Sequence, residues 1–176
     1  MSHRLQIAQL GRPVIRRKAD DVTDISHPAV QSLIDDMLLT VAEAGGMGVA
    51  APQVYESKRI IILCSRPNAR YPYAPEMEPT AIINPEITWR STEMEKDWEG
   101  CLTVPGLRGL VPRHRRIEVR YLIRDGRPIE TGYEGFIARV FQHELDHLDG
   151  KVFLDRIEDP VEIMMEREWQ RMIADR

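Results

Sequence analysis

The five residues from 143 to 147, His-Glu-Leu-Asp-His, constrain the fold of this chain more than any other segment. Side chains four positions apart lie on one face of an α-helix, with roughly 5–6 Å between their Cβ atoms. On a helix, His143 and His147 can therefore bind one metal ion, while Glu144 lies beside any water on that ion. A histidine on an apolar helix face is more often a plain core residue, but this spacing favours a metal site. We predict a metal-binding helix over residues 135–148.

The composition is that of an ordinary globular protein, with 176 residues of which 43% are hydrophobic and 30% are charged. This length predicts a single domain, residues 1–176. The net charge of −4 argues against a protein that binds nucleic acid by neutralising phosphates. Stretches of 18 apolar residues are absent from the sequence, so we expect no membrane span. The two cysteines, Cys64 and Cys101, indicate reduced thiols and a cytoplasmic location rather than a disulfide framework.

Two further helices are expected, one toward each end of the chain. Residues 27–44 repeat apolar side chains at helical spacing after a Ser-His-Pro start signal, and two glycines follow. Residues 160–174 show a second such pattern behind Pro160, with apolar positions at Val161, Met164, Met165, Trp169, Met172 and Ile173. We expect both segments to pack an apolar face on the core.

Short strands occupy most of the region between these helices. Residues 59–64 form a β-branched run typical of a buried strand. Residues 116–124 alternate apolar and polar side chains, and an Asp-Gly turn joins them to a partner strand over 128–133. Residues 65–80 are expected to form a loop, and two short strands, 81–83 and 86–89, are separated by Asn84 and Pro85. The order predicts an α+β fold with mostly antiparallel sheets packed around the central metal-binding helix, flanked by N-terminal and C-terminal helices.

A catalytic metal usually has three protein ligands, so the two histidines need a partner. Glu166 and Glu168 lie about 20 residues downstream, at a distance used by one class of zinc peptidase, but on a helix expected to pack on the core. Cys101 lies upstream, between Gly100 and an apolar residue. A single cysteine is more often a small buried hydrophobe, yet its combination with the metal helix and a glycine-rich segment favours Cys101 over the two glutamates.

Three segments together closely resemble the three motifs of the peptide deformylase family. They are Gly-Met-Gly-Val-Ala-Ala-Pro-Gln at 46–53, Glu-Gly-Cys-Leu-Thr at 99–103 and His-Glu-Leu-Asp-His at 143–147. Their order and spacing also match, as do residues 10–14 and 110–113. The resemblance covers nearly the whole chain, and only the 65–80 loop and the terminal helix match loosely. Thr103 is one departure, because that family usually has serine there.

The resemblance implies a hydrolase that removes the formyl group from N-formylmethionine on nascent polypeptides and releases formate. It assigns metal binding to Cys101, His143 and His147, with metal-bound hydroxide as the nucleophile and Glu144 as general acid and base. It assigns stabilisation of the oxyanion to the side-chain amide of Gln53 and the backbone N–H of Leu102. An exposed loop amide is the alternative interpretation of Gln53.

The implied cofactor is iron(II), with zinc, nickel or cobalt able to substitute. Coordination chemistry alone would favour zinc for a Cys-His-His site with an open position. The resemblance also implies nascent formylmethionyl peptides as the partners and leaves association with the ribosome open.

The methionine side chain needs an apolar slot, for which Met47, Phe136 and Val140 are candidates together with His143. Plain core packing would explain these residues equally well. Gly46, Gly48 and Gly100 could offer backbone groups to an extended peptide added as a strand. By resemblance Arg108 touches the peptide beyond its first residue, and simple solvent exposure is the alternative.

Three polar residues near the motifs, Glu99, Arg113 and Asp146, are assigned a structural role around the metal ligands as a hypothesis. Two rival functions stay open at this point. One is a zinc peptidase that uses a downstream glutamate, and the other is a metal-bearing relative without activity. Retention of both Glu144 and Gln53 argues against the second, since neither is needed only to hold a metal.

Overall fold

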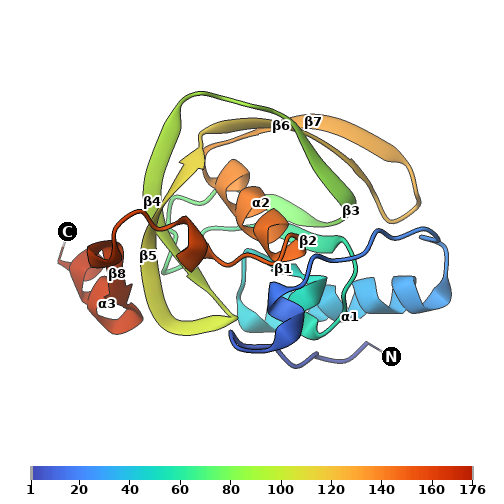
Figure 1. Cartoon of the computed structure of the whole chain (residues 1–176), viewed down its shortest axis with the longest axis horizontal. Coiled ribbons are helices and arrows are strands. Elements are labelled where there is room, and N and C mark those ends of the chain that lie inside the picture. The colour runs from blue at the N-terminus through green and yellow to red at the C-terminus, as the bar shows by residue number, and fades with distance from the viewer. Residues whose placement is uncertain (1, 176) are drawn as a thin grey trace.

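Two antiparallel sheets surround one central helix in the computed structural model, which describes residues 2–175 (Figure 1). The central helix is α2 (Gly135–Leu148), and the other helices in this range are α1 (Pro28–Ala44) and α3 (Glu166–Ala174). The larger sheet has the order β1-β2-β3-β6-β7, and the smaller has the order β4-β5-β8. The predicted α+β class with mostly antiparallel sheets is confirmed.

The strands of the larger sheet are β1 (Gly48–Ala50), β2 (Ile60–Ser65), β3 (Met77–Arg90), β6 (Arg116–Leu122) and β7 (Pro128–Glu134). Those of the smaller sheet are β4 (Met94–Cys101), β5 (Val104–His114) and β8 (Ile163–Met165). Short 3-10 turns also occur, at η1 (Pro13–Arg16) before α1, η2 (Ala51–Val54) between β1 and β2, η3 (Phe153–Arg156) after α2 and η4 (Pro160–Glu162) before β8.

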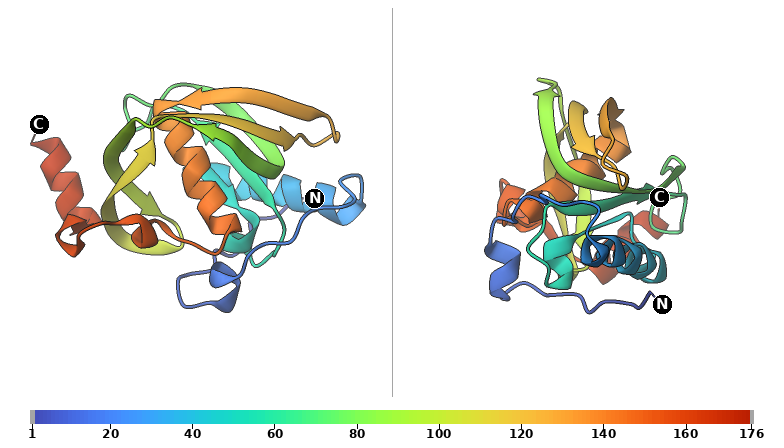
Figure 2. Two further views of the ribbon diagram at one scale, coloured as in Figure 1. Left: turned by 45° about the horizontal axis from the view of Figure 1, so that its top comes forward. Right: turned by 90° about the vertical axis from the view of Figure 1, so that its right-hand side faces the viewer.

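Strand β2 lies between two helical layers, which explains its unbroken apolar run. Ile60 and Ile62 face α1 in one core cluster, whereas Ile61 and Leu63 face α2 in another. Successive side chains of a strand point to opposite faces, so a strand covered on both sides must be apolar throughout. The two helices on opposite faces of the sheet are visible from the side in Figure 2.

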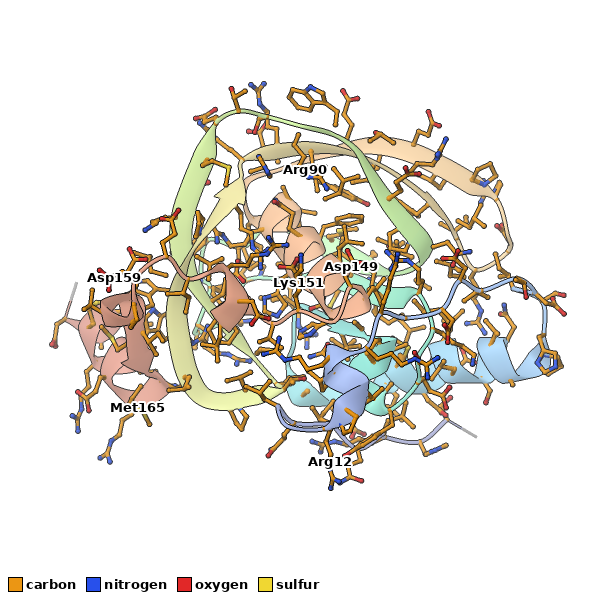
Figure 3. All side chains as sticks on the ribbon, viewed as in Figure 1. Arg12, Arg90, Asp149, Lys151, Asp159 and Met165 are labelled. Atoms are coloured by element: carbon orange, nitrogen blue, oxygen red, sulfur yellow. The ribbon has the colours of Figure 1, made fainter. Side chains whose placement is uncertain are left out.

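Helix α2 is buried along nearly its whole length, including the polar residues of its second half. Gly135 begins it with a φ of 55°, a left-handed conformation that glycine adopts without steric cost. Asp149 and Lys151 follow the helix at its C-terminal end (Figure 3). The bounds predicted from the His-Glu-Leu-Asp-His segment, 135–148, are confirmed.

Strand β3 corrects the prediction of two short strands behind a loop over 65–80. It begins at Met77, inside the predicted loop, and continues through Asn84 and Pro85 with a register shift between Ile83 and Glu86. Asn84 has a φ of 50°, and its side chain bonds the backbone N–H and C=O of Val22, each at 2.9 Å. The Asn-Pro pair therefore forms an irregularity within one strand, stabilised by a distant segment.

The C-terminal helix is shorter than predicted, because it begins at Glu166 instead of 160. Residues 163–165 form strand β8, in which Met164 pairs with Arg108 of β5. Val161, expected on the apolar face of the helix, is 83% exposed, and Met165 lies on the rim of the molecule beside α3 (Figure 3). Pairing with the edge of β5 replaces the first turns of the expected helix. None of the helices within residues 2–175 is long and apolar enough to cross a membrane.

Candidate metal centre and pocket

Three possible metal ligands from two elements meet at the centre of the molecule. His143 and His147 project from one face of α2, and Cys101 ends strand β4. Their ligating atoms all lie within 4.8 Å of one another, and the Cys101 Sγ is 3.2 Å from the His147 Nε2. Ligand atoms about 3.5 Å apart are expected around a tetrahedral ion with metal–sulfur and metal–nitrogen bonds of about 2.3 and 2.0 Å. These donors fit a small divalent transition metal.

The charge state of the cluster also suits a metal. Burial alone would raise the pKa of the Cys101 thiol, but the adjacent imidazoles of His147 and His143 hold this pKa well below its ordinary value. Thiolate is the form of cysteine that binds metals.

A buried carboxylate, Glu99 on β4, orients the first histidine. It is 4% exposed and contacts the His143 Nδ1 at 2.8 Å, which leaves the Nε2 of that ring for a metal. Glu99 also accepts hydrogen bonds from Arg113 at 2.9 and 3.0 Å and from Arg139 at 3.0 Å. Burial would raise the pKa of Glu99, but Arg113 and His143 outweigh it and lower this pKa far below its ordinary value.

The same network extends along α2 to Asp146, three residues after His143. Arg113 donates to Asp146 at 2.6 Å, and Arg156 donates to it at 2.5 and 3.0 Å. Glu99, Arg113 and Asp146 are thus bonded in one network that reaches His143. Sequence reasoning missed Arg139 and Arg156. The spacing of Arg139, four residues before His143 on the same helix face, is a signal that could have found it.

Glu144, next to His143 on α2, is a second buried carboxylate beside the cluster. It is 4% exposed, and its Oε2 atom is buried without a hydrogen-bond partner among residues 2–175. A methyl group at Gly48 would lie 2.6 Å from the Glu144 Oε1, so only glycine lets β1 approach this closely. Burial raises the pKa of Glu144 to about 7. A carboxylate with this pKa can take up and release a proton near neutral pH.

Gln53 is 1% exposed, which excludes its interpretation as an exposed loop amide. Its Oε1 accepts from the backbone N–H of Ala50 at 2.8 Å, so its NH₂ group must face the cluster. That group donates to the Thr103 Oγ1 at 3.1 Å and to the Cys101 Sγ at 3.3 Å. Thr103, the departure noted in the sequence, thus provides the hydroxyl that orients this amide.

A cavity of about 340 Å³ opens beside Glu144 and Cys101. Strand β4, at one edge of its sheet, and the segment around β1, at the edge of the other, form two of its walls. Each residue that we considered for substrate binding lines it: Gly46, Met47, Gly48, Gly100, Arg108, Phe136 and Val140. Leu102 lines it too.

The part of the cavity lining around Arg108 differs from expectation. Arg108 is 2% exposed, so the interpretation of simple solvent exposure is wrong. Glu166, considered as a third metal ligand, instead forms an ion pair with Arg108, and Glu168 contacts Arg171 at 2.7 Å on the outer surface. Tyr71 and Glu166 also line the cavity; sequence reasoning gave no reason to expect Tyr71 there and considered Glu166 only as a metal ligand.

Comparison with known proteins agrees with this geometry. The family model described as polypeptide deformylase matches residues 4–162. The chain belongs to the peptide deformylase family. Members of this family are metal-dependent enzymes that remove the N-formyl group from nascent peptides.

The similarity to named relatives covers almost all of the chain. It is 54% identical to peptide deformylase 2 of Nostoc sp., over 97% of this chain and 95% of that protein. A class I type b peptide deformylase from Acinetobacter baumannii, solved with Met-Ala-Ser bound, is 46% identical, with a TM-score of 0.87 over 89% of this chain and all of that chain. A peptide deformylase from Synechococcus elongatus, solved with actinonin, is 37% identical, with a TM-score of 0.79 over 90% of this chain and 81% of that one.

Proposed function

We propose that this deformylase removes the formyl group from N-terminal formylmethionine, with Cys101, His143 and His147 as the metal ligands and Glu144 as general acid and base. One observation carries the proposal. The three ligating atoms lie within 4.8 Å of one another, beside a buried Glu144 carboxylate that faces an open cavity.

The metal ion, when bound, supplies Lewis-acid activation of a water molecule. With the metal bound, Glu144 would take a proton from that water and would give it to the departing amine of methionine. The buried position beside the proposed ligands supports this role, since burial raises the pKa of Glu144 above its ordinary value and makes its protonated form accessible. Burial, the cause of this pKa, also keeps the carboxylate from competing bonds with solvent.

Two donors are proposed to stabilise the negative charge that develops on the formyl oxygen. They are the side-chain NH₂ of Gln53 and the backbone N–H of Leu102, beside Cys101. Gln53 is held in position by its bonds to Ala50 and Thr103. Removing one such donor typically reduces turnover by about 10²–10³.

The peptide is proposed to bind as an added strand between the two sheets. Strands β1 and β4 lie at sheet edges and both border the cavity, so their backbone groups near Gly46, Gly48 and Gly100 are available to an extended chain. Met47, Phe136 and Val140 supply an apolar lining for the methionine side chain, whose burial contributes roughly 1.5–3 kcal/mol. The Acinetobacter baumannii relative with bound Met-Ala-Ser supports this substrate class.

We further propose iron(II) as the physiological metal, with zinc, nickel or cobalt able to replace it, and a cytoplasmic enzyme consisting of one catalytic domain over residues 1–176. Thiolate and imidazole donors suit all of these ions, so the donor set supports a transition metal and the family resemblance supports iron. Metal analysis of protein purified without oxygen is expected to find iron in the active fraction. Full activity with zinc alone would contradict this assignment.

Formate release from formyl-Met-Ala-Ser, measured anaerobically beside cleavage of casein, tests the function. We expect formate from the formyl peptide and no casein fragments. Casein cleavage without formate would favour the zinc peptidase, and a metal-loaded protein inactive in both assays would favour the inactive relative.

A further inference from the structure

A buried ion pair between Arg108 and Glu166 forms part of the cavity lining. Arg108 of β5 donates its Nε to the Glu166 Oε2 and its Nη2 to the Glu166 Oε1, the second bond at 3.0 Å. The third nitrogen, Nη1, donates to the hydroxyl of Tyr71. Each nitrogen of this guanidinium therefore has a partner within the protein.

Three separate segments converge to hold Arg108. Its Cζ lies 4.1 Å from the centre of the Trp169 ring, and Trp169 is 3% exposed. Glu166 and Trp169 belong to α3, whereas Tyr71 comes from the segment between β2 and β3. A methyl group at Gly100 would lie 2.8 Å from the Arg108 Cζ, so the guanidinium packs directly on the backbone of β4. Helix α3 stands outside the smaller sheet at this position (Figure 1).

The pairing determines the charge that a peptide meets in the cavity. An arginine with unused donors binds carboxylates strongly, because its planar fork matches their two oxygens. Glu166 already occupies that fork. The other ionic groups away from the metal ligands, Arg70 and Asp97, have opposite signs, and Arg139 is bonded to Glu99. The part of the cavity lined by Arg108, Glu166 and Tyr71, here called its distal end, thus has a net charge close to zero.

We propose that Glu166 is a specificity-determining residue, which occupies Arg108 so that the enzyme does not favour peptides with acidic residues after the formylmethionine. This inference rests on the proposed deformylase activity. It explains why a segment outside the catalytic motifs reaches the cavity. An enzyme that acts on many different nascent chains must accept different residues after methionine without a strong preference.

Matched peptide pairs test the proposal. Formyl-Met-Glu-Ser and formyl-Met-Gln-Ser amides, together with formyl-Met-Ala-Glu and formyl-Met-Ala-Gln amides, differ by one charge at the second or third residue. For each pair, kcat/KM of the acidic peptide is divided by that of its neutral partner. We expect this ratio to be within about twofold of one in the wild-type enzyme, and a Glu166→Gln variant to raise it about three- to tenfold for at least one pair at low salt. The increase should shrink at 0.5 M salt.

Three variants complete the design. Glu168→Gln makes the same change of charge on the exposed side of α3 and should leave every ratio as in wild type. Glu166→Asp restores the charge and should bring the ratio back toward one. Arg108→Gln combined with Glu166→Gln should abolish the preference, because the released cation is then absent.

An unchanged ratio for both pairs in Glu166→Gln would overturn the proposal, as would a wild-type enzyme that already prefers the acidic peptides tenfold. The second result requires no variant, so the proposal stays falsifiable if Glu166→Gln folds poorly. Absence of formate release from every peptide would instead reject the proposed function itself, so the two failures are distinguishable.

Discussion

The two ends of the cavity are built differently. At the metal end, the proposed ligands come from one helix and one strand, and buried charges on the smaller sheet and on α2 itself hold them in place. At the distal end, Arg108 is held by Glu166 and Tyr71 from segments that match the family motifs loosely. The comparison indicates that the residues proposed for the reaction lie in short sequence motifs. The lining that the peptide would meet beyond methionine depends on contacts between segments far apart in the chain.

Removing the proton carrier should have the largest effect at the metal end. We expect Glu144→Gln to reduce formate release by about 10²–10⁴, because the variant cannot accept the proton of the activated water. Metal content measured by mass spectrometry should stay at the wild-type level, since Glu144 is not among the three clustered donors. Wild-type turnover in this variant would contradict the assigned role.

The Glu99→Gln variant should show how much the buried charges at the metal end contribute to the stability of the protein. It leaves Arg113 and Arg139 buried without their shared carboxylate, which we expect to lower the free energy of unfolding by about 3–5 kcal/mol. Metal affinity should fall about 10- to 100-fold, because the His143 ring loses its partner. Urea unfolding and metal competition measure the two quantities.

The matched control is Glu86→Gln, since Glu86 pairs with Arg120 at 2.7 Å on an exposed surface. The loss in unfolding free energy should be small for this variant, because solvent screens an exposed ion pair. Equal costs for the Glu99 and Glu86 variants would refute the structural importance of the buried network.

Substitutions at Thr103 test how much its hydrogen bond to Gln53 contributes to turnover. Thr103→Val removes the oxygen that accepts from Gln53 and should lower kcat about three- to tenfold, the equivalent of one neutral hydrogen bond. Thr103→Ser keeps the hydroxyl and should stay within about twofold of wild type. A serine variant as impaired as the valine variant would show that the methyl group, not the hydroxyl, matters.

The smallest predicted effect is the pH dependence of the stability that the ion pair between Arg108 and Glu166 contributes at the distal end. Burial would raise the pKa of Glu166, but Arg108 outweighs it and lowers this pKa below its ordinary value. The ion pair therefore stabilises the folded state above about pH 4.5. This contribution is lost as the pH falls through the lowered pKa, because the folded state then takes up a proton. The difference in unfolding free energy between wild type and Glu166→Gln should reach its largest value at pH 7. It should disappear at a pH below the lowered pKa of Glu166. A difference independent of pH would contradict the pairing.

The same contrast explains what the sequence could predict. The bounds of α2, the β6–β7 hairpin and the approach of Cys101 to His143 and His147 follow from local periodicity, a turn signal and the family motifs. Predictions failed where distant segments decide. Asn84 is held within β3 by Val22, and residues 163–165 pair with β5 instead of beginning a helix.

Buried polar partners were the hardest features to predict. Arg108 and Gln53 are charged or polar residues of a kind usually found at the surface, and their burial depends on Glu166 and Thr103. Those partners lie 58 and 50 residues away in the chain, respectively. A single sequence contains no periodicity or spacing that links residues so far apart.

The most direct test of the account compares the two cysteines. Cys101→Ala should lose bound metal and formate release together. Cys64→Ala, which changes a half-buried thiol in β2, should keep both. Metal content and formate release from formyl-Met-Ala-Ser are to be measured on the same anaerobic preparations. A Cys101→Ala protein that retains stoichiometric metal and wild-type turnover would contradict the central claim that this sulfur completes the catalytic metal site.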